Sequence, residues 1–477
     1  MKKFSLNLVK IVTTALIFIG VAGIKAYAEE QPSMMDLIHQ SNYNVIESDK
    51  PKSAVLIDAN TGKLLWSENP DVDHNPASIM KLMAVYLTYE AMEQGKFDLD
   101  TKVKATNRHQ QIANIYEISN NKIIEGVEYP VRELIPMALV PSSNVATMML
   151  AELVEPDAVV FLKMMNDKAQ ELGMTNTTIV NATGAEISAF RGLYAIEGVD
   201  QSPLNVNGSN VTTARDFSIF TYNLLKNYPQ ILDYTKTPTV TTMQGTPYEE
   251  SFTTYNYSVP GAESDERDRS INYHFEGVDG LKTGSSPSGA FNIDMTAKRG
   301  DLRLIAIVFG VGDWADQTGE FKRHPFANAM LNYGFNNFEV KEILPAGEQE
   351  LDDRKIDVKT ALVDTVKKGD TPKVTFASEE TLKVENSLPQ VTDKIAPVTG
   401  EFEEEQTIFS KKSKKDNKKE TGFDIVDLSH PITKWVGIVM GIIILLMLIL
   451  IIFLVRDNKK RKRVRQNRRE RNEELLK

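Results

Sequence analysis

Apolar residues between about 50 and 335 recur in two rhythms, one typical of strands and one typical of helices. Ser53–Asp58 and Lys63–Trp66 flank a glycine-containing turn, which predicts a strand, turn, strand hairpin. A second hairpin is predicted from Ala290–Lys298 and Leu302–Val311, which have a short polar turn between them. This alternation of strands with helices predicts an α/β (α+β) domain.

Helical periodicity marks several segments of the same region. A helix is expected from about Pro76 to Glu93, because proline suits a first turn and Gly95 follows as a stop. Its apolar residues fall on most faces, which predicts a central, buried helix. Further helices are expected at about 131–139, 144–154, 158–172 and 213–226, with a last one ending near Gly334.

The pattern changes at residue 338 to short alternating runs such as Ile356/Val358 and Leu382/Val384. Helix signals are absent over 338–400, so we expect a small all-β domain there, after a first domain at 29–337. Residues 401–434 are mostly charged and polar, and such a segment cannot build a core. We expect it to be a linker.

Both ends of the chain depart from this globular pattern. Residues 1–28 combine early lysines, an apolar stretch and the small-residue pattern Ala26-Tyr27-Ala28, which predicts a secretory signal peptide, with an uncleaved anchor as the alternative. The uncharged run at 435–455 is long enough to cross a bilayer as a helix. The tail at 456–477 is rich in lysine and arginine, so the positive-inside rule predicts a cytoplasmic C-terminus. A single-pass cell-membrane protein in contact with lipid, its domains outside the cell, is expected.

Composition excludes several kinds of chemistry. The 477 residues contain no cysteine, which rules out disulfides, thiolate metal sites and a cysteine nucleophile. The formal net charge is −10, which argues against general nucleic-acid binding. The six histidines are scattered without an H-E-x-x-H pattern, so a zinc protease is not expected. His274 lies eight residues before Lys282, and a structural role is expected for it.

Three short motifs fall inside the first domain. Ser78-Ile79-Met80-Lys81 is S-x-x-K, Ser142-Ser143-Asn144 is S-x-N, and Lys282-Thr283-Gly284 is K-T-G. Each is weak alone: a serine three residues before a lysine arises often by chance, and the serines before a helix can simply be caps. Together, and in this order, they predict one catalytic site.

The first motif predicts a nucleophile with its base. Ser78 lies in the first turn of the expected helix, where free backbone N–H groups favour developing negative charge. Lys81 is three residues further on and therefore shares a helix face with Ser78. A serine hydroxyl needs a base to take its proton, and Lys81 can serve if burial and a second cation, Lys282, lower its pKa.

The other two motifs supply groups for a substrate. Ser142 can relay a proton to the leaving group, and Asn144 can bind a substrate amide or hold Lys81. Lys282 and Thr283 offer a cation and a hydroxyl to a substrate carboxylate, and Gly284 permits close backbone approach. The N–H groups of Ser285 and Ser78 can form an oxyanion hole.

S-x-x-K, S-D-N and K-T-G together are the signature of penicillin-binding proteins and class A β-lactamases. With the motifs in place, residues 50–400 resemble the low-molecular-mass penicillin-binding proteins that act as serine-type D-alanyl-D-alanine carboxypeptidases. The resemblance extends to the segments 58–65, 75–78, 213–216, 277–284 and 304–310. It implies a transpeptidase/β-lactamase-like fold with a small β domain, and acylation of Ser78 by peptidoglycan stem peptides ending in D-Ala-D-Ala. It also implies inhibition by β-lactam antibiotics, and it implies no cofactor or metal.

The sequence departs from the family pattern in several places. Ser143 stands where the signature has Asp, and residues 183–270 are expanded. The family often ends in an amphipathic membrane helix, whereas this chain has a full apolar span and a basic tail. A class A-like β-lactamase would need a deacylating Glu in an E-x-x-L-N pattern, which is absent between Asn144 and Lys282. A membrane-tethered penicillin sensor or wall-binding protein with little turnover stays open as an alternative. The motifs do not separate a carboxypeptidase from an endopeptidase or transpeptidase.

Overall fold

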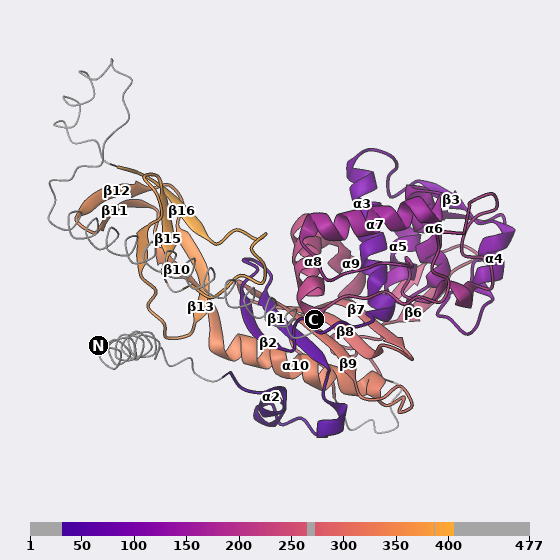
Figure 1. The fold of residues 1–477 in the computed structure, drawn as a ribbon, viewed down its shortest axis with the longest axis horizontal. Coiled ribbons are helices and arrows are strands. Elements are labelled where there is room, and N and C mark those ends of the chain that lie inside the picture. Colours follow the sequence, from indigo (N-terminus) through magenta and orange to yellow (C-terminus); the bar gives the residue numbers. More distant parts are fainter. Residues whose placement is uncertain (1–30, 265–271, 386, 405–477) are drawn as a thin grey trace, which may run out of the picture. The chain divides into compact units, whose positions relative to one another are not determined.

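The computed structural model describes residues 31–264, 272–385 and 387–404 (Figure 1). The predicted signal peptide (1–28), transmembrane helix (435–455) and basic tail (456–477) lie outside the described residues. Among the helices of the described ranges, none combines the length and the apolar character that a bilayer crossing needs.

A five-stranded antiparallel sheet forms the centre of the first domain, and both predicted hairpins are confirmed within it. The strand order is β2-β1-β9-β8-β7, so β7 is an edge strand. Alternate residues point to opposite faces: Val55 and Ile57 belong to one hydrophobic core, and Ala54 and Leu56 belong to the other. The strands are β1 (Ser53–Asp58), β2 (Leu64–Glu68), β7 (Val278–Ser286), β8 (Ala290–Arg299) and β9 (Leu302–Val311).

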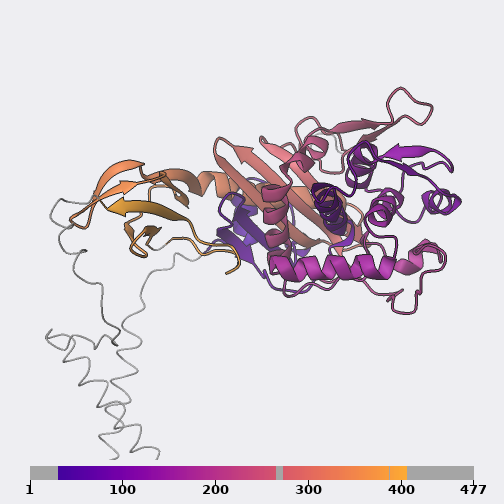
Figure 2. The same cartoon turned by 90° about the horizontal axis from the view of Figure 1, so that it is seen from above.

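Helices cover both faces of this sheet. The helices α2 (Met34–Gln40) and α10 (Gly319–Asn337) pack against one face, and α8 (Ala214–Asn227) packs against the other. The helix α3 (Lys81–Glu93) lies among the helices on the α8 side and is buried around its circumference, as predicted (Figure 2). The remaining α-helices are α4 (Asn107–Ala113), α5 (Val131–Leu139), α6 (Asn144–Val154), α7 (Ala158–Leu172) and α9 (Leu232–Thr235).

Short elements complete the domain. Four 3₁₀ turns are η1 (Glu47–Asp49), η2 (Ala77–Met80), η3 (Ile187–Phe190) and η4 (Pro229–Ile231). Two small antiparallel pairs join β3 (Lys102–Lys104) to β4 (Glu128–Pro130), and β5 (Thr239–Thr242) to β6 (Glu250–Thr253).

The expected end of the last helix is wrong by about one turn. The helix α10 continues through Gly334 to Asn337. A Cβ on Gly334 would lie 2.5 Å from Leu304 Cδ1 on β9. This glycine therefore allows a close helix–sheet contact and does not stop the helix.

The region after α10 is all-β, as predicted. A two-stranded sheet joins β10 (Phe338–Leu344) to β13 (Leu362–Lys367), and a five-stranded sheet has the order β11-β12-β16-β15-β14. The expected linker at 401–434 is wrong at its start, because 399–404 form β16 and pair with β12 and β15. The rest of that linker lies outside the described residues. The other strands are β11 (Gly347–Leu351), β12 (Arg354–Val358), β14 (Val374–Phe376), β15 (Thr381–Val384) and β16 (Thr399–Glu404).

The β domain is attached to the first domain by more than the chain connection. Lys63 forms an ion pair with Asp364 of β13, and both side chains are 1% exposed. The segment 387–398 also returns to the first domain, where Val391 and Ile395 join its hydrophobic core. Val391 N–H donates to Gly62 O at 2.9 Å. The two domains therefore share buried polar and apolar contacts.

Candidate active site

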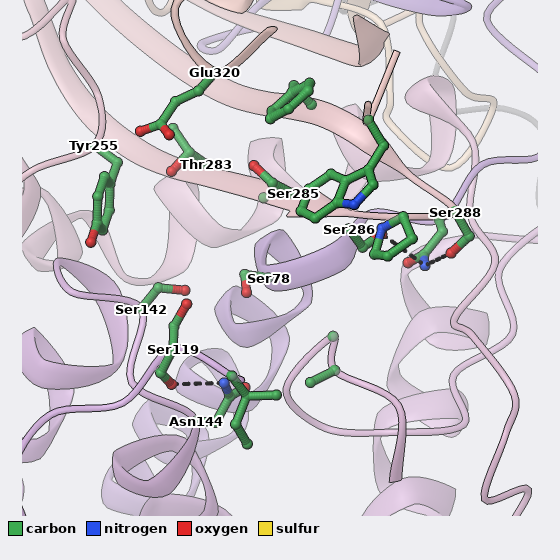
Figure 3. Close-up of a pocket in the computed structure, with 18 of the residues that line it drawn as sticks. Ser78, Ser119, Ser142, Asn144, Tyr255, Thr283, Ser285, Ser286, Ser288 and Glu320 are labelled. Atoms are coloured by element: carbon green, nitrogen blue, oxygen red, sulfur yellow. Dashed lines mark hydrogen bonds between the residues drawn. The ribbon is translucent and has the colours of Figure 1, made fainter. Parts of the chain in front are cut away.

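A cleft of about 520 Å³ lies between β7 and the helical region, and it contains residues of all three motifs. Ser78, Ser142 and Asn144 lie on one side of it, and Thr283 and Ser285 lie on the other (Figure 3). Lys81 and Lys282 are buried at 0% and 2% exposure, behind the residues that line the cleft. The three motifs, which are dispersed over about 200 residues of sequence, therefore meet at one site.

The nucleophile lies in η2, which runs directly into α3. Lys81 Nζ donates to Ser78 Oγ at 2.9 Å and to the carbonyl oxygen of Thr183 at 2.7 Å. Ala77 has a left-handed backbone (φ 50°), which is unusual for a residue with a Cβ. The first motif thus has the predicted geometry, with serine and lysine on one face of a helical start.

Burial lowers the pKa of Lys81 well below its usual value, and the neighbouring charge of Lys282 lowers it further. Both causes act in the same direction, because a low-dielectric site and a like charge each disfavour the ammonium form. A neutral amine at this position can accept a proton from Ser78. This agrees with the cause that the sequence suggested.

Arg323 is a site residue that sequence reasoning missed. It lies on α10, is 1% exposed, and donates through Nη1 to Ser285 Oγ at 3.0 Å. Burial and the charge of Arg323 lower the pKa of Lys282 to about 7. The carboxylate nearest to Arg323 is that of Glu320, whose Oε1 lies 3.9 Å from Arg323 Nη2. The buried Nε of Arg323 has no partner among the described residues. Two buried cations at one end of the cleft favour an anionic ligand.

The residues of the second motif have separate positions. Ser142 has a left-handed backbone (φ 62°), and its buried Oγ has no partner among the described residues. Ser143 is the N-cap of α6, where its hydroxyl accepts from Ala146 N–H at 3.1 Å. Asn144 donates to Ser119 O at 2.7 Å. Within the described residues Lys81 Nζ bonds to Ser78 Oγ and Thr183 O, and the buried Asn144 Oδ1 has no hydrogen-bond partner. The two roles expected for Asn144 stay predictions.

The third motif lies within β7, whereas the sequence placed it ahead of a strand. Lys282 Nζ donates to Thr283 O at 3.0 Å. A Cβ on Gly284 would lie 2.5 Å from Pro76 O, so this glycine lets β7 pass directly against η2. Since β7 is an edge strand, the N–H groups that point away from β8 are open to a substrate. The oxyanion hole at Ser285 and Ser78 stays a prediction.

The expanded region contributes backbone to the site. Gly184 has φ 87°, and a Cβ there would lie 1.9 Å from Ala77 O, so this segment packs directly behind the nucleophile. Gly184, Ala185 and Glu186 line the cleft. No motif marks these contacts, because they depend on main-chain atoms. Nε2 of His274 forms a hydrogen bond with Ala262 O at 2.6 Å, which agrees with the structural role expected for this histidine.

Ser78 and Lys81 on a helical start, opposite an edge strand with K-T-G, define a serine acyltransferase site of the penicillin-binding type. The family model described as D-alanyl-D-alanine carboxypeptidase matches residues 40–313, and the chain belongs to that family. A second model, described as a domain of unknown function (DUF1958), matches residues 340–403, which correspond to the β domain.

Curated relatives include D-alanyl-D-alanine carboxypeptidase DacF of Bacillus subtilis, 29% identical over 289 residues, covering 61% of this chain and 63% of DacF. DacA of Escherichia coli is 27% identical over 300 residues, covering 62% of this chain and 64% of DacA. The chain thus spans slightly less than two thirds of the length of these relatives.

Solved structures share the fold. A peptidoglycan synthesis regulatory factor (PBP3) of Streptococcus pneumoniae superposes with a TM-score of 0.60 at 25% identity, covering 75% of this chain and 99% of that one. Penicillin-binding protein 5 of Haemophilus influenzae gives a TM-score of 0.54 at 22% identity, covering 75% and 98%. These likenesses extend over both the catalytic and the β domain, since each covers more of the chain than the catalytic domain occupies.

Proposed function

We propose that this protein is a serine D-alanyl-D-alanine carboxypeptidase, which removes the terminal D-Ala from peptidoglycan stem peptides. The observation that carries the proposal is the 2.9 Å contact between Ser78 Oγ and Lys81 Nζ, with the lysine fully buried beside Lys282. A buried amine with a lowered pKa can act as the general base for a neighbouring serine, which is then the nucleophile. Membership of the carboxypeptidase family supports the choice of substrate.

Acylation begins when neutral Lys81 takes the proton from Ser78 Oγ. The oxygen attacks the carbonyl carbon of the penultimate D-Ala, and the N–H groups of Ser78 and Ser285 stabilise the resulting oxyanion. One such donor is typically worth about 3–4 kcal/mol in the transition state. The C–N bond then breaks, and D-alanine leaves after its amine receives the proton from Lys81 through Ser142.

The substrate carboxylate fits the cationic end of the cleft. Lys282 and Arg323 supply positive charge there, and Thr283 offers a hydroxyl. The rest of the peptide extends along the open edge of β7, as an added antiparallel strand would. This orientation puts the carbonyl of the scissile bond beside Ser78.

A water molecule completes the reaction: it attacks the acyl carbon as neutral Lys81 takes its proton, and Lys81 returns that proton to Ser78 Oγ as the acyl bond breaks. A β-lactam acylates the same serine, but its leaving nitrogen stays attached to the acyl group and obstructs the approach of water. The proposal therefore includes β-lactam antibiotics as inhibitors. A slow hydrolytic step would make the protein a penicillin sensor, and a fast one on penicillin would make it a lactamase.

The test uses the purified full chain with a pentapeptide ending in D-Ala-D-Ala and, separately, with a labelled penicillin. We expect the wild type to release D-alanine and to retain the label, and Ser78→Ala to do neither. Release of no D-alanine by a labelled wild type would favour the sensor. Labelling of Ser78→Ala would overturn the proposal, and rapid hydrolysis of penicillin would favour the lactamase.

We also propose that the protein is anchored in the cell membrane, with its catalytic domain outside the cell. The support is the sequence alone: the signal-like segment 1–28, the apolar run 435–455 and the basic tail that follows it. Protease added to intact cells without a wall should digest the catalytic domain and leave an epitope at the C-terminus protected. Digestion of that epitope, or recovery of the protein in the soluble fraction, would contradict this location.

A further inference from the structure

The catalytic lysine depends on a carbonyl group outside the three motifs. Besides Ser78 Oγ, Lys81 Nζ donates to Thr183 O at 2.7 Å. Residues 181–186 belong to no helix or strand, so sheet or helix hydrogen bonds do not fix this carbonyl. The position of the base therefore depends on whatever holds this stretch of backbone.

Two buried side chains hold it: Asn210, whose Oδ1 accepts from Asn181 N–H at 3.0 Å, and Tyr194, which bonds closer to the carbonyl. Ala182 N–H donates to the Tyr194 hydroxyl at 2.8 Å, one residue before the carbonyl that Lys81 uses. Tyr194 is 1% exposed, and its ring packs edge-on against Phe190 at 5.1 Å between centroids. On the other side of the carbonyl, Gly184 N–H donates to Asn181 Oδ1 at 2.6 Å.

A charged cluster fixes the backbone of Tyr194 in turn. Arg108 Nη1 of α4 donates to Leu193 O at 2.5 Å and to Tyr194 O at 3.4 Å. The same arginine forms an ion pair with Glu152 of α6, and His109 Nε2 lies 2.9 Å from the second oxygen of that carboxylate. All three side chains of the cluster are less than 20% exposed. Helices α4 and α6 thus anchor the tyrosine.

We propose that Tyr194 is a positioning residue for Lys81, acting through the backbone of Ala182 and Thr183. It touches neither substrate nor reacting atoms; its hydroxyl fixes the carbonyl that orients the Lys81 amine toward Ser78. This inference rests on the proposed function, in which Lys81 is the general base.

Loss of the hydroxyl would have a specific consequence. In Tyr194→Phe, the Ala182 N–H is buried without an acceptor, so the backbone must move to find one. Displacement of Thr183 O removes an acceptor that favours the charged form of Lys81, which lowers the pKa of that lysine. Lys282 on β7 is the charged group that acts on Lys81, and it keeps its place in this variant.

Tyr129 offers a matched control. It too is a fully buried tyrosine whose hydroxyl accepts from a backbone N–H, that of Ile124 at 3.0 Å. Ile124 does not line the cleft. Tyr129→Phe therefore removes the same kind of hydrogen bond without disturbing Thr183.

The experiment measures the rate of acylation by a labelled penicillin against pH, together with Tm, for the full chain and both variants. We expect both variants to lose a few degrees of Tm. Only Tyr194→Phe should lose about 10- to 100-fold in acylation rate, a size typical of a misplaced catalytic group. In the pH profile of the acylation rate, the acid limb of Tyr194→Phe should move to lower pH. The acid limb of Tyr129→Phe should stay where it is in the wild type.

Equal acylation rates in the two variants, or an unshifted acid limb in Tyr194→Phe, would overturn the inference. If Tyr194→Phe does not fold, Arg108→Lys takes its place. Lysine keeps the positive charge, but it cannot bond the two backbone carbonyls and the Glu152 carboxylate at once. The same shift of the acid limb to lower pH is then expected. A wild type that is not labelled at Ser78 would mean that the proposed function itself has failed.

Discussion

The site combines residues with very different tasks within a few positions of one another. Ser142 and Ser143 are adjacent, yet the hydroxyl of Ser142 is buried and unpaired among the described residues, and that of Ser143 caps α6. The first is available to a substrate, and the second is committed to a helix. Substitution at neighbouring positions should therefore affect different properties.

Ser142→Ala should lower the rate of D-alanine release about 10²- to 10⁴-fold, the usual contribution of a proton relay, with little change in Tm. Ser143→Ala should lose the cap of α6 and about 1 kcal/mol of stability, with a small effect on rate. Steady-state kinetics and thermal unfolding of both variants check this. The reverse pattern, or equal losses of rate, would contradict the assignment of roles.

The pKa of Lys282, lowered to about 7, predicts a pH dependence of binding. Its ammonium form, which attracts the substrate carboxylate, is present below pH 7 and is lost as the pH rises through that value. We expect kcat/KM to fall above about pH 7 because KM rises, while kcat changes less, since a bound carboxylate stabilises the cation. Lys282→Arg should remove this alkaline limb in kcat/KM, because arginine stays charged.

Motifs indicated most of these residues but could not indicate all of them. Ser78, Lys81 and Lys282 were predictable because their chemistry requires particular side chains at particular spacings. Arg323 lies on a helix about 40 residues after K-T-G and reaches the site only through the packing of α10 on the sheet. Thr183 contributes a carbonyl group, which any residue type would supply, so no sequence signal marks it.

At the scale of elements, helix ends were predicted where the signal is local. The helices α5, α6 and α7 have the expected limits. For two of them the signal is a cap: Ser143 caps α6, Asp157 caps α7, and Gly173 ends α7 in a left-handed conformation. The strand β7 was missed because its motif is polar, although packing against η2 and α9 buries it. The end of α10 was missed because Gly334 serves tertiary packing.

Gly334→Ala tests that packing role. In an exposed helix this substitution would stabilise by up to about 1 kcal/mol. Here the added methyl meets Leu304 and Leu56, so we expect a loss of about 1–3 kcal/mol from overpacking. Chemical denaturation measures the change, with Asn336→Ala in the exposed last turn of the same helix as a control that should not destabilise. A stabilised Gly334→Ala would contradict the close contact.

At the scale of the whole molecule, the buried pair between Lys63 and Asp364 connects the two domains. Removal of one partner leaves an uncompensated buried charge, which typically costs about 3–5 kcal/mol. We therefore expect Lys63→Met to destabilise strongly and to separate the unfolding of the β domain from that of the catalytic domain. Differential scanning calorimetry should show two transitions where the wild type shows one.

The double variant Lys63→Met/Asp364→Leu is the control for that prediction. It removes both charges and fills the space with apolar atoms, so it should recover most of the lost stability. The bond from Thr365 Oγ1 to Asp58 Oδ2, which is 2.7 Å long, is present in both variants. Failure to recover would therefore contradict the uncompensated charge as the cause of the loss.

The returning segment 387–398 has a consequence for how the chain matures. Val391 and Ile395 complete a core whose other members all precede residue 310. During synthesis from the N-terminus, the nucleophile and its base emerge long before these two residues do. A ribosome-bound chain that ends near residue 340 should therefore carry every catalytic group and still lack a closed core, so that the capacity to react with penicillin should arise late, once the β domain has been made.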